Sequence, residues 1–351
     1  MIYLDHSNID QSDIDMVNKA MREGQVSTAG RYVEEFEDLM REYFGRNVVA
    51  LNSGTAALFL ALKAHGVRKG TEIHIPALTF VGTYNAIVHA GCVPVVRDVD
   101  RFSWSLSLQI DMEVFPPMTL PVDLYGNIAD SVPGRFPYIK DAAESFGSTC
   151  SLDGFNVGVY SFNGNKIITT GGGGLYVGDK AELVWKLAHQ GKHDGVATNM
   201  GMTSLSAALG ISQFRKLDHF LELKRMYHET YLEQLGPYVQ FQKHNENSTY
   251  WLNCCLLPGD IPTIQKDLAD RGIQTRRIFK PLGPRDACPN AWYIYDHGIC
   301  LPSSTLNRKQ DILTVCKEIK DIVYRQNHSY NRGNWISREF CGHFVTTCST
   351  G

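Results

Sequence analysis

The chain has 351 residues, of which 43% are hydrophobic and 20% are charged, and its formal net charge is −3. This is ordinary globular composition, and the length allows a sizeable core shared between one large domain and a smaller one. The charge balance predicts no basic stripe for a nucleic acid, and no apolar run approaches the ~20 residues of a membrane span. We therefore expect neither a nucleic-acid partner nor a membrane partner.

The start of the chain, Met1-Ile2-Tyr3-Leu4-Asp5-His6, lacks the basic and apolar regions of a signal peptide. Nine cysteines are scattered without a C-x-x-C pair, and Cys and His show no metal-ligand spacing. An odd count without a framework fits reduced thiols. We expect a cytoplasmic protein without a bound metal.

Short apolar runs alternate with helical patterns over the first two thirds of the chain. A helix is predicted over 32–44, where apolar residues recur at helical spacing. The apolar runs that predict strands are 48–51, 72–75, 93–96, 118–122, 137–140, 157–162 and 174–177. The helical patterns are 55–65, 79–90, 181–189 and 203–235. This alternation predicts an α/β fold with a mainly parallel sheet, in a large domain over 1–237.

A second unit is predicted over 238–326. It has a strand-like run at 249–257, a helix over 262–271 and a last helix over 307–325, which together suggest a small α+β domain. Residues 327–351 are rich in Asn, Ser, Thr, Gly and aromatics. We expect this tail to be poorly ordered, and a docking arm or an oligomer contact is the alternative.

The most informative stretch begins with Asp141-Ala142-Ala143-Glu144-Ser145-Phe146-Gly147. It continues with Tyr160-Ser161-Phe162-Asn163-Gly164-Asn165-Lys166 and Thr169-Thr170-Gly171-Gly172-Gly173-Gly174. It places an acid, a hydroxyl and a lysine near the ends of apolar runs, where α/β sheets bind ligands. A lysine can form an imine, an acid can partner a pyridinium nitrogen, and hydroxyls can hold a phosphate. Taken singly, these residues are more often a turn, a surface charge and a flexible loop.

A second segment upstream is Ala50-Leu51-Asn52-Ser53-Gly54-Thr55-Ala56-Ala57-Leu58. It predicts a strand, a tight turn and a helix whose N-terminus could bind an anion. The alternative is an ordinary capped helix. The order and spacing of both segments favour a site for an aromatic, phosphorylated aldehyde.

With further blocks, these motifs resemble the DegT/DnrJ/EryC1/StrS group of sugar-nucleotide aminotransferases, within the type I (aspartate aminotransferase) fold of pyridoxal-phosphate enzymes. The resemblance runs from about Gln25 to Tyr324. The further blocks are Gly24 to Glu37, Pro76 to Thr83, Asp98 to Asp100, Leu124 to Gly126 and Ser204 to Gly210. The resemblance implies a seven-stranded, mainly parallel sheet, a smaller α+β C-terminal domain, and pyridoxal 5'-phosphate as cofactor.

By this resemblance, Lys166 is the catalytic lysine that carries the cofactor. Asp141 is the partner of the pyridine nitrogen, which keeps the ring able to accept electrons. Glu144 lies near the phenolic oxygen of the cofactor, and the alternative is an acid in the first turn of a helix.

The same resemblance assigns the remaining cofactor-binding residues. Gly54, Thr55 and Ser161 form the phosphate cradle. Phe80 stacks on the ring, although a phenylalanine in an apolar run is more often part of a core. Asn199 reaches the phosphate bound to a neighbouring subunit, so a homodimer with shared active sites is expected.

The presence of Lys166 indicates an aminotransferase, because a related branch carries His there and performs dehydration. The resemblance implies transfer from L-glutamate to a nucleotide-linked 4-keto-6-deoxyhexose. The alternatives are a 3-keto-sugar nucleotide aminotransferase and a non-catalytic pyridoxal-phosphate-binding homologue. The chain departs from the family at Met200-Gly201, which replaces an aromatic-Arg pair, and at Asp123, which replaces His. We expect the change at Asp123 to reshape the substrate end of the pocket, and the change at Met200-Gly201 to alter the shape of the loop that reaches the neighbouring subunit.

Overall fold

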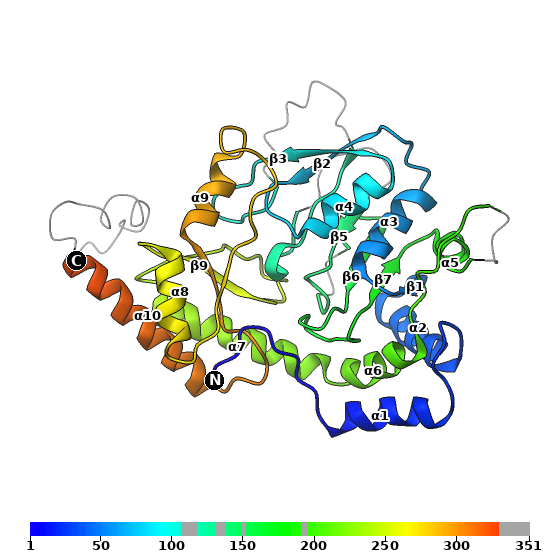
Figure 1. Ribbon diagram of the computed structural model, residues 1–351, viewed down its shortest axis with the longest axis horizontal. Helices are drawn as coiled ribbons and strands as arrows, with labels where there is room; N and C mark the ends of the chain where they lie inside the picture. Colours follow the sequence, from blue (N-terminus) through cyan, green and yellow to red (C-terminus); the bar gives the residue numbers. More distant parts are fainter. Residues whose placement is uncertain (107–117, 131–137, 149–151, 191–194, 330–351) are drawn as a thin grey trace, which may run out of the picture.

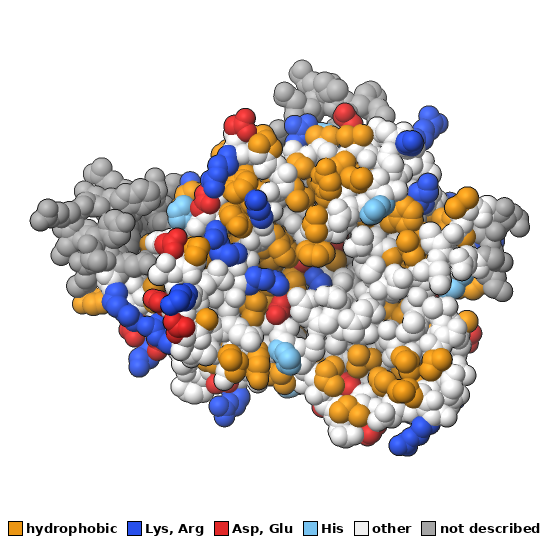
Figure 2. All heavy atoms as spheres, viewed as in Figure 1, with side chains coloured by type: hydrophobic (Ala, Val, Ile, Leu, Met, Phe, Trp, Pro, Cys, Tyr) orange, Lys and Arg blue, Asp and Glu red, His pale blue; other side chains and the backbone are white. Residues whose placement is uncertain are grey.

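The structure is a computed structural model that describes residues 1–351 apart from 107–117, 131–137, 149–151, 191–194 and 330–351 (Figure 1). Within the described residues, no helix combines the length and the apolar character needed to cross a membrane. On the face seen in Figure 2, Lys and Arg side chains are interspersed with Asp and Glu over helices α8 (Ile261–Ala269) and α10 (Lys309–Ser329).

In the described part of the chain, seven strands build the central sheet. They are β1 (Val48–Leu51), β2 (Glu72–Pro76), β3 (Val93–Arg97), β4 (Met118–Thr119), β5 (Ile139–Asp141), β6 (Val157–Ser161) and β7 (Gly174–Val177). One ladder has the order β1-β7-β6-β5 and the other β3-β2-β4. Val122 and Asp141 form a parallel bridge between them, and the Asp141 N–H donates to the Pro121 carbonyl at 3.0 Å.

The pairing of these strands confirms the predicted fold class. Strand β7 is antiparallel to both of its neighbours, whereas the other described pairings in the sheet are parallel. Strands β1 and β6 are buried along their whole length because helices cover the sheet, and this burial explains the continuous apolar sequence of β1. The sheet is thus the mainly parallel, seven-stranded sheet of the type I fold.

Helices flank this sheet (Figure 1). They are α1 (Gln11–Arg22), α2 (Arg31–Phe44), α3 (Gly54–Ala64), α4 (Val81–His89), α5 (Ala181–Ala188), α6 (Ser204–Phe214) and α7 (Leu217–Leu235). The helix predicted over 203–235 is two helices, because Lys216 leaves the helical conformation between α6 and α7. The Lys216 amine forms an ion pair with Asp13 of α1 at 2.6 Å, and this pair connects α1 to the turn between α6 and α7. Helix α1 is not among the helices predicted from the sequence.

A second, antiparallel sheet lies beyond the long helices. Its order is β10-β11-β9-β8, formed by β8 (Gln240–Phe241), β9 (Asn253–Leu256), β10 (Arg276–Arg277) and β11 (Gly298–Leu301). Helices α8, α9 (Pro289–His297) and α10 accompany it. The strand predicted over 249–257 starts only at Asn253, because Tyr250 has a positive φ of 52°. The boundary at residue 238 remains a prediction, and the predicted tail lies outside the described residues from 330 onward.

The N-terminal segment, residues 1–10, connects distant parts of the chain. Ile2 forms a bridge with Ile273, and the Ser303 N–H donates to the Leu4 carbonyl at 2.7 Å. The Asp5 carboxylate accepts a hydrogen bond from the Asn165 side chain at 2.8 Å. This segment therefore lies between the second sheet and the loop that carries Lys166.

Candidate active site

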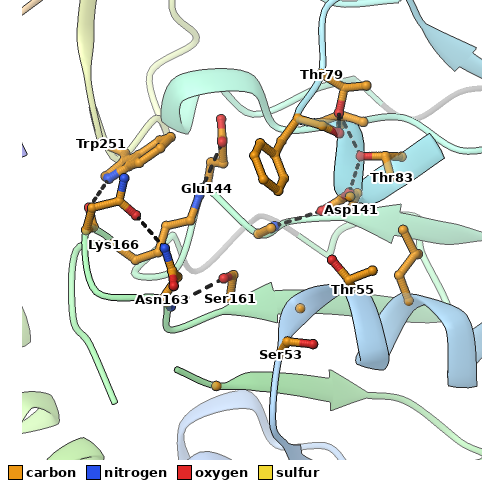
Figure 3. A pocket seen from close by; sticks show the side chains of 18 of the residues that line it. Ser53, Thr55, Thr79, Thr83, Asp141, Glu144, Ser161, Asn163, Lys166 and Trp251 are labelled. Atoms are coloured by element: carbon orange, nitrogen blue, oxygen red, sulfur yellow. Dashed lines mark hydrogen bonds and ion pairs between the residues drawn. The ribbon is translucent and has the colours of Figure 1, made fainter. Parts of the chain in front are cut away.

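A pocket opens at the carboxyl ends of the central strands (Figure 3). Seven of the eight predicted site residues line it: Gly54, Thr55, Phe80, Asp141, Glu144, Ser161 and Lys166. The eighth, Asn199, is exposed, pairs with His189 through a backbone bridge and is not among the lining residues. The fold thus brings together side chains that are more than a hundred residues apart in the sequence.

Asp141 ends strand β5 and is buried. The Thr83 hydroxyl donates to its Oδ2 at 2.7 Å, and the Ala143 N–H donates to its Oδ1 at 3.1 Å. Burial raises the pKa of this carboxyl to about 6, against the lowering effect of the two hydrogen bonds. In the described part of the chain no basic side chain forms an ion pair with it. A cationic ring nitrogen would supply the missing opposite charge.

Lys166 lies on the other side of the pocket (Figure 3). Its side chain is only 12% exposed, which excludes the interpretation as an ordinary surface lysine. Its Nζ lies 3.2 Å from Glu144 Oε1 and 3.7 Å from the centroid of the Trp251 ring. Burial lowers the pKa of the Lys166 amine, and the charge of Glu144 opposes this shift. The lowered pKa favours the neutral, reactive amine.

Glu144 can orient the Lys166 amine because a second hydrogen bond holds its carboxylate in place. Its Oε2 accepts a hydrogen bond from the Tyr125 N–H at 2.7 Å, in the short 3₁₀ helix η1 (Leu124–Gly126). Glu144 is outside the described helices, so the alternative interpretation as a helix first-turn acid is wrong. Its proximity to the phenolic oxygen of a cofactor remains a prediction.

The start of α3 forms a third part of the pocket. Ser53 is its N-cap and accepts from the Ala56 N–H at 3.1 Å, while Ser53, Thr55 and Ser161 lie near one another (Figure 3). A Cβ at Gly54 would lie 3.0 Å from the Ser161 Cβ, so glycine allows the close approach of α3 to β6. Free N–H groups at a helix start, flanked by hydroxyls, can bind a phosphate.

Phe80 lies at the mouth of the pocket, immediately before α4. Its side chain is 57% exposed, so it is not a core residue, and its ring centroid lies 5.9 Å from that of Phe279. An exposed aromatic ring at a pocket mouth is available to stack on a flat ligand.

Three lining residues come from the second unit, and no sequence pattern predicts them: Trp251, Arg276 and Phe279. The Trp251 indole N–H donates to the Asn165 carbonyl at 2.7 Å. The guanidinium carbon of Arg276 lies 5.8 Å from the Trp251 ring centroid. Its Nη1 lies 3.2 Å from Asp5 Oδ2, while its Nε and Nη2 are buried without a hydrogen-bond partner. No local pattern marks these residues, because only the tertiary fold brings them to Lys166.

The expectation for Asp123 is wrong. This residue is fully buried beneath the loop that carries Asp141 and Glu144, and it does not line the pocket. Its carboxylate pairs with Lys140 Nζ at 2.9 Å and accepts from the Ser145 hydroxyl at 2.5 Å. Asp123 therefore stabilises the loop that carries Asp141 and Glu144 and does not form part of the pocket wall.

The residues present fit pyridoxal phosphate. A buried acid without a cationic partner, a buried amine with a lowered pKa and a helix start that can bind an anion share one pocket. These are the three groups that hold the ring nitrogen, the aldehyde and the phosphate of this cofactor. In the described residues, no group of three or more His, Cys, Asp or Glu side chains could hold a metal ion.

Comparison with known proteins identifies the family. The model of the DegT/DnrJ/EryC1/StrS aminotransferase family matches residues 7–320. The chain belongs to this family. Its members depend on pyridoxal phosphate, and this DegT-family chain is accordingly a pyridoxal-phosphate-dependent sugar aminotransferase. The interpretation as a non-catalytic homologue gains no support.

Relatives of this DegT-family chain are named for particular sugar nucleotides. It is 29% identical over 343 residues to a GDP-perosamine synthase of Escherichia coli O157:H7, covering 87% of this chain and 94% of the relative. It is 31% identical to the GDP-perosamine synthase of Caulobacter vibrioides, over 78% and 83% of the two chains. It is 30% identical to a UDP-4-amino-4,6-dideoxy-N-acetyl-beta-L-altrosamine transaminase of Campylobacter jejuni, over 80% and 84%.

Solved structures agree on the fold. The putative sugar aminotransferase Spr1654 from Streptococcus pneumoniae, in its PMP-form, superposes with a TM-score of 0.85 at 19% identity, over 94% of this chain and all of that one. DesI in the presence of its TDP-sugar product gives 0.84 at 22% identity, over 93% and 94%. These likenesses establish the architecture of this DegT-family chain.

Proposed function

We propose that this protein transfers the amino group of L-glutamate to the 4-ketone of a nucleotide-linked 6-deoxyhexose, giving an amino sugar nucleotide for glycan biosynthesis. The observation that carries the proposal is the buried Lys166 amine facing Glu144 in the same pocket as Asp141. The choice of C4 over C3 is supported by the Campylobacter relative, whose name describes a 4-amino sugar. The relatives named for GDP-perosamine favour a GDP-linked substrate.

Pyridoxal phosphate, when bound, supplies an aldehyde that can exchange amines and a ring that accepts an electron pair. Asp141 would hold the ring nitrogen, and Gly54, Thr55 and Ser161 would hold the phosphate. At neutral pH Asp141 is mostly anionic, because its pKa of about 6 lies below 7. It can therefore provide the negative charge that a protonated ring nitrogen requires.

Lys166 carries the protons in this proposal. Its Nζ takes a proton from the α-carbon of the donor and later delivers one to the sugar carbon. Burial favours the neutral amine needed for the first transfer, and Glu144 accepts a hydrogen bond from that amine. Glu144 thereby orients Nζ toward the pocket.

Arg276 supports an amino-acid donor. Two of its guanidinium nitrogens are buried without a partner beside the pocket, and a guanidinium can bind a carboxylate through two parallel hydrogen bonds. We assign the α-carboxylate of L-glutamate to this residue. Asp5, which lies 3.2 Å from Nη1, leaves the other nitrogens available.

The proposal is tested by supplying L-glutamate and a panel of GDP-, UDP- and TDP-linked 4-keto and 3-keto sugars, followed by mass spectrometry and NMR of the product. We expect an amine at C4 of a 4-keto-6-deoxy sugar and a 2-oxoglutarate co-product. Lys166→Ala should be inactive, because no other amine is proposed to replace Nζ. Amination of 3-keto sugars alone, or full activity of Lys166→Ala, would contradict the proposal.

The donor site is tested with Arg276→Gln. Loss of a charge-assisted, two-pronged contact should raise KM for L-glutamate by about 10–100-fold and leave KM for the sugar nucleotide unchanged. Arg277→Gln is the matched control, because this neighbour on β10 donates instead to the Tyr295 carbonyl at 2.7 Å. Equal effects of the two variants would remove Arg276 from the donor site.

A further inference from the structure

Lys224 is a buried lysine that the chemistry described above does not use. It lies on α7 and is only 3% exposed. Its Nζ donates to the Trp251 carbonyl at 2.8 Å and to the Ser303 carbonyl at 2.6 Å. The buried Lys140 has a carboxylate partner, whereas in the described part of the chain Lys224 has no ion-pair partner.

A lysine in this position is energetically costly. Burial lowers the pKa of Lys224 to about 7, although the charge of Asp5 opposes the shift. An ammonium buried without a carboxylate carries a desolvation cost that no opposite charge offsets. The Lys224 amine reduces this cost only by satisfying two buried carbonyls, and the identity of those carbonyls indicates a more specific role.

The contacts of Lys224 lead directly to the catalytic amine. The residue that it holds, Trp251, donates its indole N–H to the Asn165 carbonyl, immediately before Lys166. The same ring lies 3.7 Å from Lys166 Nζ. Trp251 is thus fixed at its backbone by Lys224 and at its indole by the loop that carries Lys166.

We propose that Lys224 is a positioning residue, which holds the Trp251 backbone so that the indole ring fixes the place of Lys166 Nζ. The proposal rests on the catalytic role of Lys166. The ring face attracts a cationic amine and limits its rotation, so displacement of Trp251 changes both the position of Nζ and its proton affinity. The long helix α7 would in this way reach the active site without contacting any substrate.

The chain offers a matched control on the same helix. Tyr231, seven residues further along α7, is also buried and donates to the Pro302 carbonyl at 2.9 Å. Both Lys224→Met and Tyr231→Phe remove a buried hydrogen bond between α7 and the segment 302–303. Only the Lys224 change also releases Trp251.

The experiment compares both variants with the wild type, each reconstituted with pyridoxal phosphate. Thermal unfolding is measured first, and then the absorbance of the bound cofactor is titrated against pH. Charged or titratable side chains that line the Lys166 surroundings, namely Asp5, His6, Asp141, Glu144, Lys224 and Arg276, contribute to this titration. Lys224→Met should shift its midpoint by at least half a pH unit and lower kcat about tenfold, because small displacements of a reacting group are costly. Tyr231→Phe should change neither.

The decisive measurement is whether the effects of changing Lys224 and Trp251 on kcat are coupled. If Lys224 acts through Trp251, the variant Lys224→Met/Trp251→Phe should be no slower than Trp251→Phe alone. Additive effects on kcat, or an unshifted midpoint in Lys224→Met, would overturn the proposal. If Lys224→Met does not fold, Lys224→Gln, which retains a donor for one carbonyl, is measured in its place. The experiment also shows whether the catalytic role of Lys166 itself is wrong. In that case the cofactor absorbance of Lys166→Ala would titrate with pH as it does in the wild type.

Discussion

Asp141 combines a catalytic requirement with a cost to folding. Its pKa of about 6 in the folded protein exceeds the value of 3.8 from which it is raised, so the folded state binds the proton more tightly than the unfolded state. Stability from this residue is therefore fully present below pH ~4 and is lost as the pH rises through about 6. At neutral pH the cofactor-free protein holds a charge that destabilises it.

The loss of stability from Asp141 with rising pH predicts how the variant Asp141→Asn behaves. Without cofactor, the variant should gain about 1–3 kcal/mol of unfolding free energy relative to wild type above pH 6, and the gain should vanish below pH 4. The same variant should bind pyridoxal phosphate more weakly, because the ring nitrogen loses its charged partner. Urea unfolding from pH 4 to 8 and a cofactor titration measure both effects. Parallel stability curves for the two proteins would contradict the raised pKa.

The sequence predicts a place in the pocket for some residues and not for others. Asp141 and Ser161 end strands that apolar runs had predicted, and Lys166 follows the second of these strands, so their convergence could be inferred from the rule that strand ends meet at one edge. Trp251 and Arg276 come from the second unit, and no spacing relates them to Lys166. Their place depends on how that unit packs against the sheet.

At the scale of elements, the glycine run that leads into β7 and supplies its first residue sets how closely this strand approaches the start of α3. A Cβ at Gly174 would fall on the backbone carbon and oxygen of Ser53, whereas a Cβ at Gly172 would have the Asn52 carbonyl oxygen as its nearest neighbour, at 3.9 Å. The two glycines therefore differ in steric demand, although they lie two residues apart.

We accordingly expect Gly174→Ala to destabilise the protein by about 2–4 kcal/mol, because strand β7 and the turn before α3 must separate. Gly172→Ala, the control within the same run, should cost less than about 1 kcal/mol. Denaturant unfolding measures the difference. Equal losses in the two variants would show that the contact with Ser53 does not limit the structure.

Elements also differ in how well their patterns reveal them. Strand β1 was predictable because both of its faces are covered and its sequence, Val-Val-Ala-Leu, is continuously apolar. Helix α1 was missed because a polar residue anchors it: Asp13 is buried and binds Gln213 and Lys216. Strand β10 has only two residues, which is too short for any periodicity to show.

At the scale of the whole molecule, Asn199 is the predicted site residue that does not reach the pocket of its own chain. Its exposed position is compatible with the homodimer that we propose, in which each Asn199 contacts the phosphate bound to the partner. A site built from two chains can be restored by combining chains that lack different parts.

Mixing Lys166→Ala and Asn199→Ala proteins should therefore restore activity, provided that Asn199→Ala alone is impaired. A mixed dimer contains one site with an intact Lys166 and an intact Asn199, so up to about a quarter of the wild-type activity per chain is expected after random exchange. Activity is measured before and after subunit exchange, and sedimentation at assay concentration gives the mass. A fully active monomer would rule out shared sites.

The N-terminal segment has a consequence for how the protein is made. Tyr3 exchanges hydrogen bonds with Asn307, and Asp5 forms an ion pair with Arg276. A ribosome adds about 5–20 residues per second, so roughly 15–60 s pass between synthesis of the first residues and of their partners. During that time the sheet and the loop that carries Lys166 can form, but the ion pair between Asp5 and Arg276 cannot. The site that we propose for the donor thus forms only after the ribosome has passed Arg276 and the strands of the second sheet.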